Sequence, residues 1–136
     1  MDNRIVVGSI YRYEFSFTQE DVINFAHASG DFNPLHIDEE YASGTIFKGT
    51  IIHGFLGGSV FSKVFGTIFP GKGTIYLKQD MTFIKPMCIG TNYRATFEVI
   101  ETDILKNRAI VITNITDSDD LIVIKGEALI KHSNIY

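Results

Sequence analysis

Two side chains that can transfer protons, Asp31 and His36, lie five residues apart in the first third of the chain. Histidine titrates near neutral pH, so an aspartate and a histidine that share one water molecule can move protons there. Asn33 and Pro34 lie between them, and Asp and Asn also form ordinary turns by bonding their own backbone. The spacing therefore leaves two interpretations open, a simple turn and an acid–base pair.

His53 and Gly54 open the longest apolar stretch of the chain. The first N–H groups of a helix have no acceptor within the helix, and glycine lets another atom approach them closely. A carbonyl oxygen bound there would be stabilised as it gains negative charge. Beside a water molecule held by Asp31 and His36, such a helix start favours the hydration of a double bond conjugated to a carbonyl.

The segments before and after Asp31 predict how this residue is positioned. Thr18 and Asp21 have the spacing of a capping box, and Gly30 is suited to end the helix that begins there. Pro34 lacks an N–H and keeps the residue before it out of the helical region. Residues 31–36 are therefore predicted to form a stiff loop between two helices, a common place for catalytic side chains.

Residues 53–66 are apolar on nearly every side, which predicts a helix enclosed by other structure. Gly54, Gly57 and Gly58 would each weaken an exposed helix by about 1 kcal/mol relative to alanine. The close approach of a strand or a ligand would offset this cost. Ordinary helix packing is the alternative explanation for these glycines.

Alternation of apolar and polar residues predicts one early strand and four later ones, over residues 11–17, 75–83, 92–99, 108–115 and 121–130. Because the later connections are short, the four later strands are expected to be antiparallel neighbours. The elements together predict an α+β fold in which an antiparallel sheet wraps around a central buried helix. The length indicates one domain over residues 1–136.

Composition and sequence pattern limit the binding partners and the cellular location that are expected for this protein. The net charge is -4 without a block of like charges, which argues against nucleic acid and an anionic membrane as partners. Residues 51–69 approach the length of a membrane span but contain Lys63 and four glycines, so a buried helix is the better interpretation. No signal peptide is visible, and we expect a cytoplasmic protein. One cysteine and the absence of a His-Glu-x-x-His spacing predict no metal site.

Residues 25–36, Phe-Ala-His-Ala-Ser-Gly-Asp-Phe-Asn-Pro-Leu-His, resemble the hydratase-2 motif of MaoC-like proteins. That family includes the (R)-specific enoyl-CoA hydratases, which have the hotdog fold. Residues 53–54, 70–79 and 86–90 also resemble the family, so the similarity covers nearly the whole chain. The resemblance implies a hotdog fold and the conversion of trans-2-enoyl-CoA and water to (3R)-hydroxyacyl-CoA.

The resemblance also implies catalytic roles. Asp31 and His36 would hold and activate the water molecule, and the N–H of Gly54 would bind the thioester oxygen. Which of the two side chains delivers which proton stays open. The family implies an acyl-CoA substrate, no separate cofactor because coenzyme A is part of the substrate, and a homodimer whose coenzyme A pockets borrow residues from both chains.

Three further residues are expected near the substrate. Asn33 would shape the loop, Ser62 would lie near the site on the central helix, and His53 would either cap that helix or border the pocket. Phe61 and Phe65 are expected to close the acyl pocket and so to favour short chains.

Two other functions stay open. An acyl-CoA thioesterase of the same fold is the nearest, but many such enzymes place a carboxylate on the central helix, and residues 55–69 contain none. A non-catalytic acyl-thioester-binding protein would have no need to keep Asp31 and His36 together with an open helix start. The acyl carrier could be coenzyme A or a carrier protein, and the small size and lack of a second repeat favour free acyl-CoA.

Overall fold

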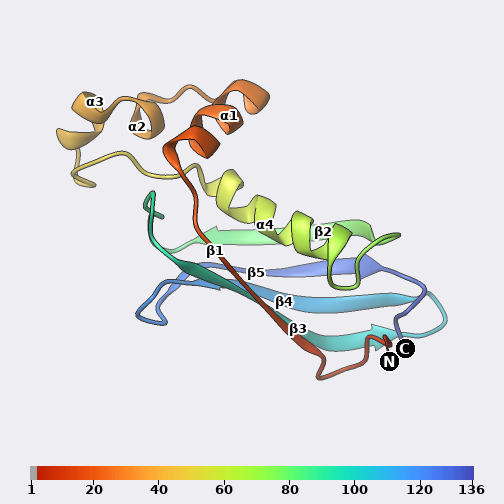
Figure 1. Ribbon diagram of the computed structural model, residues 1–136. Helices are drawn as coiled ribbons and strands as arrows, with labels where there is room; N and C mark the ends of the chain where they lie inside the picture. Colours follow the sequence, from red (N-terminus) through yellow and green to blue (C-terminus); the bar gives the residue numbers. More distant parts are fainter. Residues whose placement is uncertain (1–2) are drawn as a thin grey trace.

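The computed structural model describes residues 3–136, which form one antiparallel sheet, one long helix and three shorter helices (Figure 1). The chain starts with strand β1 (Ile10–Phe15) and continues through helices α1 (Gln19–Ser29), α2 (Pro34–Ile37), α3 (Glu39–Ser43) and α4 (Gly54–Thr67). It ends with strands β2 (Ile75–Phe83), β3 (Tyr93–Asp103), β4 (Arg108–Thr116) and β5 (Ile122–Lys131). The predicted α+β layout is confirmed.

The strands lie in the order β1-β3-β4-β5-β2, and each neighbouring pair is antiparallel. The prediction of sequential neighbours is right for β3, β4 and β5 and wrong for β2, which pairs with β5 instead of β3. The reason lies in residues 84–92, which cross the end of the sheet rather than making a tight turn. Along this crossing, the Ile84 N–H donates to the Val123 carbonyl (2.8 Å) and the Gly90 N–H donates to the Phe17 carbonyl (3.0 Å).

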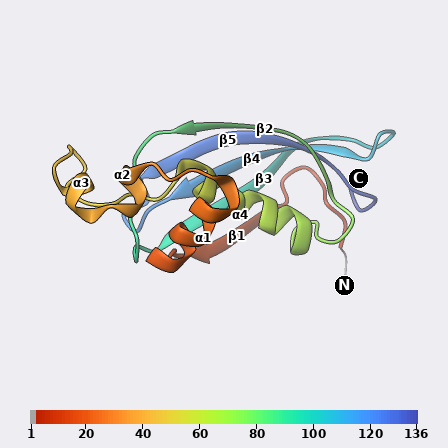
Figure 2. The same cartoon turned by 90° about the horizontal axis from the view of Figure 1, so that it is seen from above.

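Helix α4 lies along the concave face of the sheet, as the view from above shows (Figure 2). Its Phe61 and Phe65 pack against Phe97 of β3 with ring centroids 5.8 Å and 5.2 Å apart, in the edge-on geometry that aromatic pairs favour. Phe61 is 0% exposed and Phe65 is 1% exposed. Both therefore belong to the hydrophobic core of the single chain, and the expectation that they close an acyl pocket stays a prediction.

The glycines of α4 let side chains from β2 and the segment after it approach the helix closely. A Cβ atom on Gly54 would lie 2.7 Å from the ring of Phe83, and one on Gly57 would lie 2.7 Å from the sulfur of Met87. A Cβ atom at either position would require the neighbouring side chain to shift. All these contacts are with side chains from the sheet side, so the alternative explanation, ordinary helix packing, accounts for these glycines.

One side of α4 is uncovered in this chain. Phe55 is 68% exposed, and Ser59, Ser62 and Lys63 are exposed on the same side, at helical spacing. The prediction of a helix enclosed on every side is therefore wrong for the single chain. Within residues 3–136, neither α4 nor any other helix is long and apolar enough to cross a membrane.

Candidate active site

The segment that contains Asp31 begins where α1 ends. The capping box predicted for α1 is confirmed, because Thr18 Oγ1 accepts the Asp21 N–H (3.1 Å) and Asp21 Oδ2 accepts the Thr18 N–H (2.9 Å). Gly30 ends the helix in the left-handed conformation (φ 81°) and donates its N–H to the Ala26 carbonyl at 2.8 Å, also as predicted. These bonds place Asp31 directly after a well-defined helix end.

Asn33 and Pro34 start a new helical turn rather than extending a loop. Asn33 is the N-cap of α2, and its Oδ1 accepts the N–H of Leu35 at 3.1 Å. Proline fits the first helical position, where an N–H would have no helical partner. The prediction of irregular backbone through His36 is therefore wrong, because Pro34 restricts the residue before it and not the residues after it. His36 lies on this short helix and is 8% exposed.

His36 has a defined tautomer. Its Nδ1 lies 2.8 Å from the carbonyl oxygen of Ile51. A carbonyl only accepts hydrogen bonds, so Nδ1 carries the proton and Nε2 of the neutral ring keeps a lone pair. Burial lowers the pKa of His36 below its usual 6.5, against an opposing contribution from the bond to Ile51. At neutral pH the ring is thus uncharged and able to accept a proton at Nε2.

Asp31 lies close to this ring. The side-chain ligand atoms of Asp31, His36 and His53 all lie within 4.8 Å of one another. The Asp31 backbone N–H donates to Ser29 Oγ (3.1 Å), and its Oδ1 accepts the Asn33 N–H (3.1 Å). The carboxylate is exposed and has its other oxygen available for a water molecule. One water molecule can therefore reach both Asp31 and His36.

His53 lies behind His36 and is 2% exposed. Its Nε2 donates to the backbone carbonyl of Asp31 (3.0 Å), and its ring packs against that of His36 with centroids 3.9 Å apart and the two planes tilted by 31°. It is the N-cap residue of α4, but its side chain makes no capping bond, so only its backbone has the capping role that was considered. The residues that line the apolar pocket include His36 and Gly54 but not His53. Its predicted contact with substrate stays a prediction.

The N-terminal end of α4 offers unpaired donors. The N–H of Gly54 is in the first turn and has no acceptor within the helix, and His53 supplies no side-chain cap. The helix dipole favours negative charge at this end. The first carbonyl engaged is that of His53, which accepts the N–H of Gly57 at 3.1 Å. A developing oxyanion can therefore bind at Gly54.

An apolar pocket of about 420 Å³ opens beside Gly54 and His36. This volume lies within the range of small-molecule sites. Most of its walls are apolar, formed by Phe47, Ile51, Ile52, Phe55, Phe83, Ile84, Pro86, Met87 and Ile124. The pocket is suited to a hydrocarbon chain whose reactive end lies at the helix terminus.

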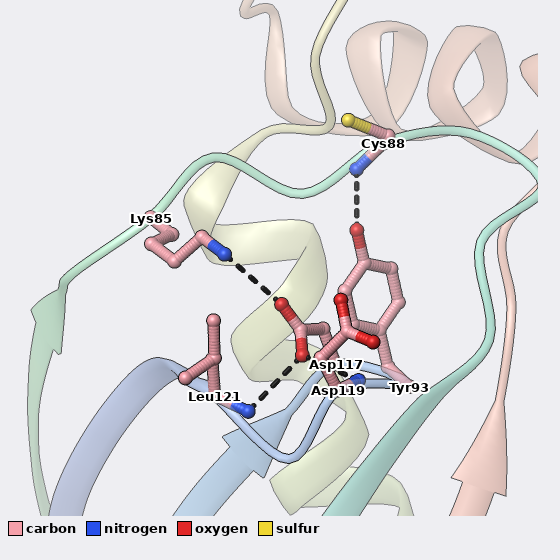
Figure 3. Close-up of polar contacts among 6 residues, drawn as sticks. All are labelled: Lys85, Cys88, Tyr93, Asp117, Asp119 and Leu121. Carbon is pink, nitrogen blue, oxygen red and sulfur yellow. Dashed lines mark hydrogen bonds and ion pairs between the residues drawn. The ribbon is translucent and has the colours of Figure 1, made fainter.

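A polar cluster at the strand ends fixes the pocket wall that residues 83–87 form (Figure 3). Lys85 Nζ donates to Asp117 Oδ2 at 3.0 Å, and this contact is the main reason that the pKa of Asp117 is lowered. The N–H of Cys88 donates to the hydroxyl oxygen of Tyr93 at 2.6 Å, and burial raises the pKa of Tyr93. Sequence reasoning missed Asp117 and Tyr93 because a loop acid and a strand tyrosine give no signal of such a contact.

Asp31, His36 and His53 are also the residues that could hold a metal ion. Two zinc ligands, each 2.0–2.1 Å from one ion, lie at most about 4.2 Å apart. The group spreads up to 4.8 Å, and the two stacked rings would have to separate to face one ion. The side chains as placed fit a water molecule better than a closed zinc site. The expected absence of a metal stays a prediction.

Ser62 does not lie in this group. It is exposed on α4, eight residues after Gly54 or about 12 Å along the helix axis. It is not among the residues that line the apolar pocket. Its predicted place near the substrate therefore stays untested in the single chain.

This chain is similar in sequence and fold to known proteins. Residues 7–119 match the family described as MaoC like domain. The chain belongs to the MaoC-like family. This MaoC-like chain is 38% identical to the (R)-specific enoyl-CoA hydratase of Aeromonas caviae over 125 residues, which cover 92% of this chain and 93% of the relative. It is 35% identical over 130 residues to the 3-hydroxybutyryl-CoA dehydratase of Methylorubrum extorquens, which covers 96% of this chain and 81% of that protein.

Solved structures agree with the sequence similarity. The (R)-hydratase of A. caviae, described as involved in PHA biosynthesis, superposes with a TM-score of 0.89 at 38% identity, over 92% of this chain and 95% of that one. The R-hydratase PhaJ1 of Pseudomonas aeruginosa superposes with a TM-score of 0.87 at 40% identity, over 91% and 79% of the two chains. The predicted hotdog fold is confirmed.

Proposed function

We propose that this MaoC-like chain is an (R)-specific enoyl-CoA hydratase, a hydro-lyase. It adds water across the 2,3 double bond of trans-2-enoyl-CoA to give (3R)-hydroxyacyl-CoA, and it catalyses the reverse dehydration. The observation that carries the proposal is that Asp31 lies close to a neutral His36, and that His36 lines the same pocket as Gly54 at the open N-terminus of α4. The hydratase and dehydratase relatives support it.

The first step is the attack of water. The water molecule lies between the Asp31 carboxylate and the lone pair on His36 Nε2. As the bond from its oxygen to C3 forms, its proton passes to this pair, and the electrons of the double bond move onto the thioester oxygen. The Gly54 N–H and the dipole of α4 stabilise the resulting enolate oxygen.

The second step returns the proton. The carbonyl of the thioester re-forms as C2 takes a proton from the Asp31–His36 pair. Because the pair lies on one side of the substrate, oxygen and hydrogen are added to the same face of the double bond. One water molecule is consumed, and the two side chains return to their starting protonation states.

The apolar pocket beside Gly54 holds the acyl chain in this proposal. Most of its walls are hydrocarbon, including Phe47, Phe83 and Met87, and Lys85 also lines it, with its Nζ bound to Asp117. We propose coenzyme A rather than a carrier protein as the acyl carrier, in line with the A. caviae and M. extorquens relatives. Catalysis without a separate cofactor and a cytoplasmic location stay predictions from the sequence.

We also propose a homodimer that forms through β2. This strand is at the edge of the sheet, so one row of its backbone groups is free to pair with another strand. Its Ile75, Leu77 and Phe83 are 53%, 41% and 48% exposed, which is unusual for large apolar side chains. A second copy would cover these side chains and could also cover Phe55 on the exposed side of α4.

The experiment is a direct assay with purified protein and crotonyl-CoA. Hydration lowers the absorbance of the conjugated thioester without releasing free thiol, and chiral analysis of the product should give the (3R) isomer. Release of free coenzyme A at a comparable rate would instead indicate a thioesterase. A rate with crotonyl-carrier protein above that with crotonyl-CoA would overturn the proposed carrier.

A further inference from the structure

His53 is in a position that the proposed mechanism does not use. Its side chain is 2% exposed, it does not line the apolar pocket, and it makes no side-chain capping bond to α4. It nevertheless touches both residues of the proposed acid–base pair. These contacts suggest a role for His53 in holding the two residues of the pair in place.

The first contact fixes the backbone of Asp31. The carbonyl oxygen of Asp31 can only accept, so the Nε2 of His53, 3.0 Å away, carries the ring proton. At its other end, the Asp31 peptide is held by the bond from its N–H to Ser29 Oγ. His53 therefore fixes the one group of the Asp31 backbone that α1 does not reach.

The second contact supports the ring of His36. The rings of His53 and His36 lie 3.9 Å apart between centroids, with 31° between their planes. The ring centroid of Phe25 in α1 lies 4.8 Å from that of His53. His53 therefore packs against both α1 and α2 and restricts the position of His36. The bond from His36 Nδ1 to Ile51 then sets the rotation of the ring.

We propose that His53 is a positioning residue that keeps the Asp31 carboxylate and His36 Nε2 at the spacing of a single shared water molecule. It acts through the hydrogen bond to the Asp31 carbonyl and through the ring stack on His36. The inference rests on the proposed hydratase function and adds a residue to it. A misplacement of about 1 Å in a catalytic group can cost about 100-fold in rate, so such a role is measurable.

Two substitutions separate the contacts. His53→Phe keeps a flat ring for the stack and loses the donor, whereas His53→Gln keeps an N–H donor at the same distance from the backbone and loses the ring. We expect His53→Phe to lower kcat for crotonyl-CoA by about 10- to 100-fold with little change in KM. We expect His53→Gln to recover part of that loss.

His132 provides the matched control. It is 7% exposed, and its Nε2 also donates to a distant carbonyl, that of Lys72 at 2.8 Å, far along the chain from the site. His132→Phe removes the same kind of bond and should lower the melting temperature while leaving kcat within about twofold. Parental kcat in His53→Phe would overturn the proposal, and so would an equal loss of kcat in His53→Phe and His132→Phe.

A measurement on the unmodified protein tests the proposal even if the variants do not fold. Nitrogen-15 NMR of the imidazole rings should show neutral His53 protonated at Nε2 and neutral His36 protonated at Nδ1. A His53 ring protonated at Nδ1 instead would overturn the proposal. If the unmodified protein fails to hydrate crotonyl-CoA, both the proposed function and the role of His53 fail. Full activity in His53→Phe overturns only the role of His53.

Discussion

The two ends of α4 differ in how their backbone groups are satisfied. At the C-terminal end, the Ile68 N–H donates to the Val64 carbonyl (2.9 Å), and the Gly71 N–H returns to the Phe65 carbonyl (3.0 Å). At the N-terminal end, Gly54 begins the helix with an N–H that has no helical acceptor and with no side-chain cap before it. One end is closed by its own chain, and the other presents donors to a ligand.

A buried histidine near each end shows the same difference. His132 donates from Nε2 to Lys72 and accepts the Asn134 N–H at Nδ1 (3.0 Å), so both of its nitrogens are paired. His53 donates from Nε2, but its buried Nδ1 has no partner within residues 3–136. Most buried polar atoms in folded proteins are paired, so an unpaired one needs an explanation. The buried histidine beside the proposed site has such an atom, and the one near the closed end of α4 does not.

The largest effect is predicted for substitutions in the acid–base pair near the N-terminal end of α4. Asp31→Asn or His36→Ala should lower kcat by about 100-fold or more, because the shared water molecule loses one of its two proton carriers. Steady-state hydration of crotonyl-CoA measures this, with circular dichroism to verify folding. At the closed end, His132→Gln should leave kcat within about twofold. A near-parental rate in either site variant would contradict the assignment.

The next effect concerns the helix terminus. Gly54→Ala would place a methyl group against the ring of Phe83 and beside the proposed oxyanion site, so we expect kcat/KM to fall by about 10-fold. The additional change Phe83→Leu should restore space but not the full rate. Gly66→Ala, near the other end of α4, meets nothing within 4 Å and should raise the free energy of unfolding by up to about 1 kcal/mol. If Gly54→Ala and Gly66→Ala changed kcat/KM equally, the two ends of α4 would not differ in the way described above.

A smaller effect tests the pocket wall. Tyr93→Phe removes the hydroxyl oxygen that accepts the Cys88 N–H and should lower the free energy of unfolding by about 1 kcal/mol. Because residues 83–87 line the pocket, activity toward long enoyl chains should change more than activity toward crotonyl-CoA. Urea denaturation and a chain-length series measure the two quantities. An unchanged chain-length profile would show that this contact does not set the pocket.

The smallest effect is a shift along the pH axis. Burial lowers the pKa of His36 below 6.5, so kcat/KM should rise with pH through a midpoint below 6.5 and change little above it. The unfolded chain binds a proton at His36 before the folded protein does, so this residue's contribution to stability is lost as pH falls from 6.5 through the lower folded pKa. His36→Asn should remove that part of the pH dependence of stability. A midpoint above 6.5 would contradict a buried neutral ring.

The elements that depend on local chemistry could be predicted from the sequence. The capping box of Thr18 and the left-handed Gly30 follow from side-chain type and spacing, and the structure confirms both. The close contacts of Gly54 are side-chain packing, the alternative considered for it. The pairing of β2 with β5 could not be predicted. It depends on the path of residues 84–92, whose hydrogen bonds are to residues distant in the sequence.

The candidate site was predictable in its residue types but not in its arrangement. Asp31 and His36 were found because their spacing is unusual, yet the short helix that carries His36 was missed. Ile51 orients His36 through its backbone carbonyl, for which the residue type gives no signal. The hydrogen bond from His53 to the Asp31 carbonyl could not be predicted either, because every residue type has a backbone carbonyl.

The most direct test of the account is a crystal structure of the Asp31→Asn variant with trans-2-enoyl-CoA bound. We predict that the thioester oxygen lies about 2.7–3.1 Å from the backbone nitrogen of Gly54. We also predict that C3 faces a water molecule within hydrogen-bond reach of His36 Nε2. A thioester oxygen bound away from the start of α4, or a C3 atom with His36 out of reach of any such water, would contradict it.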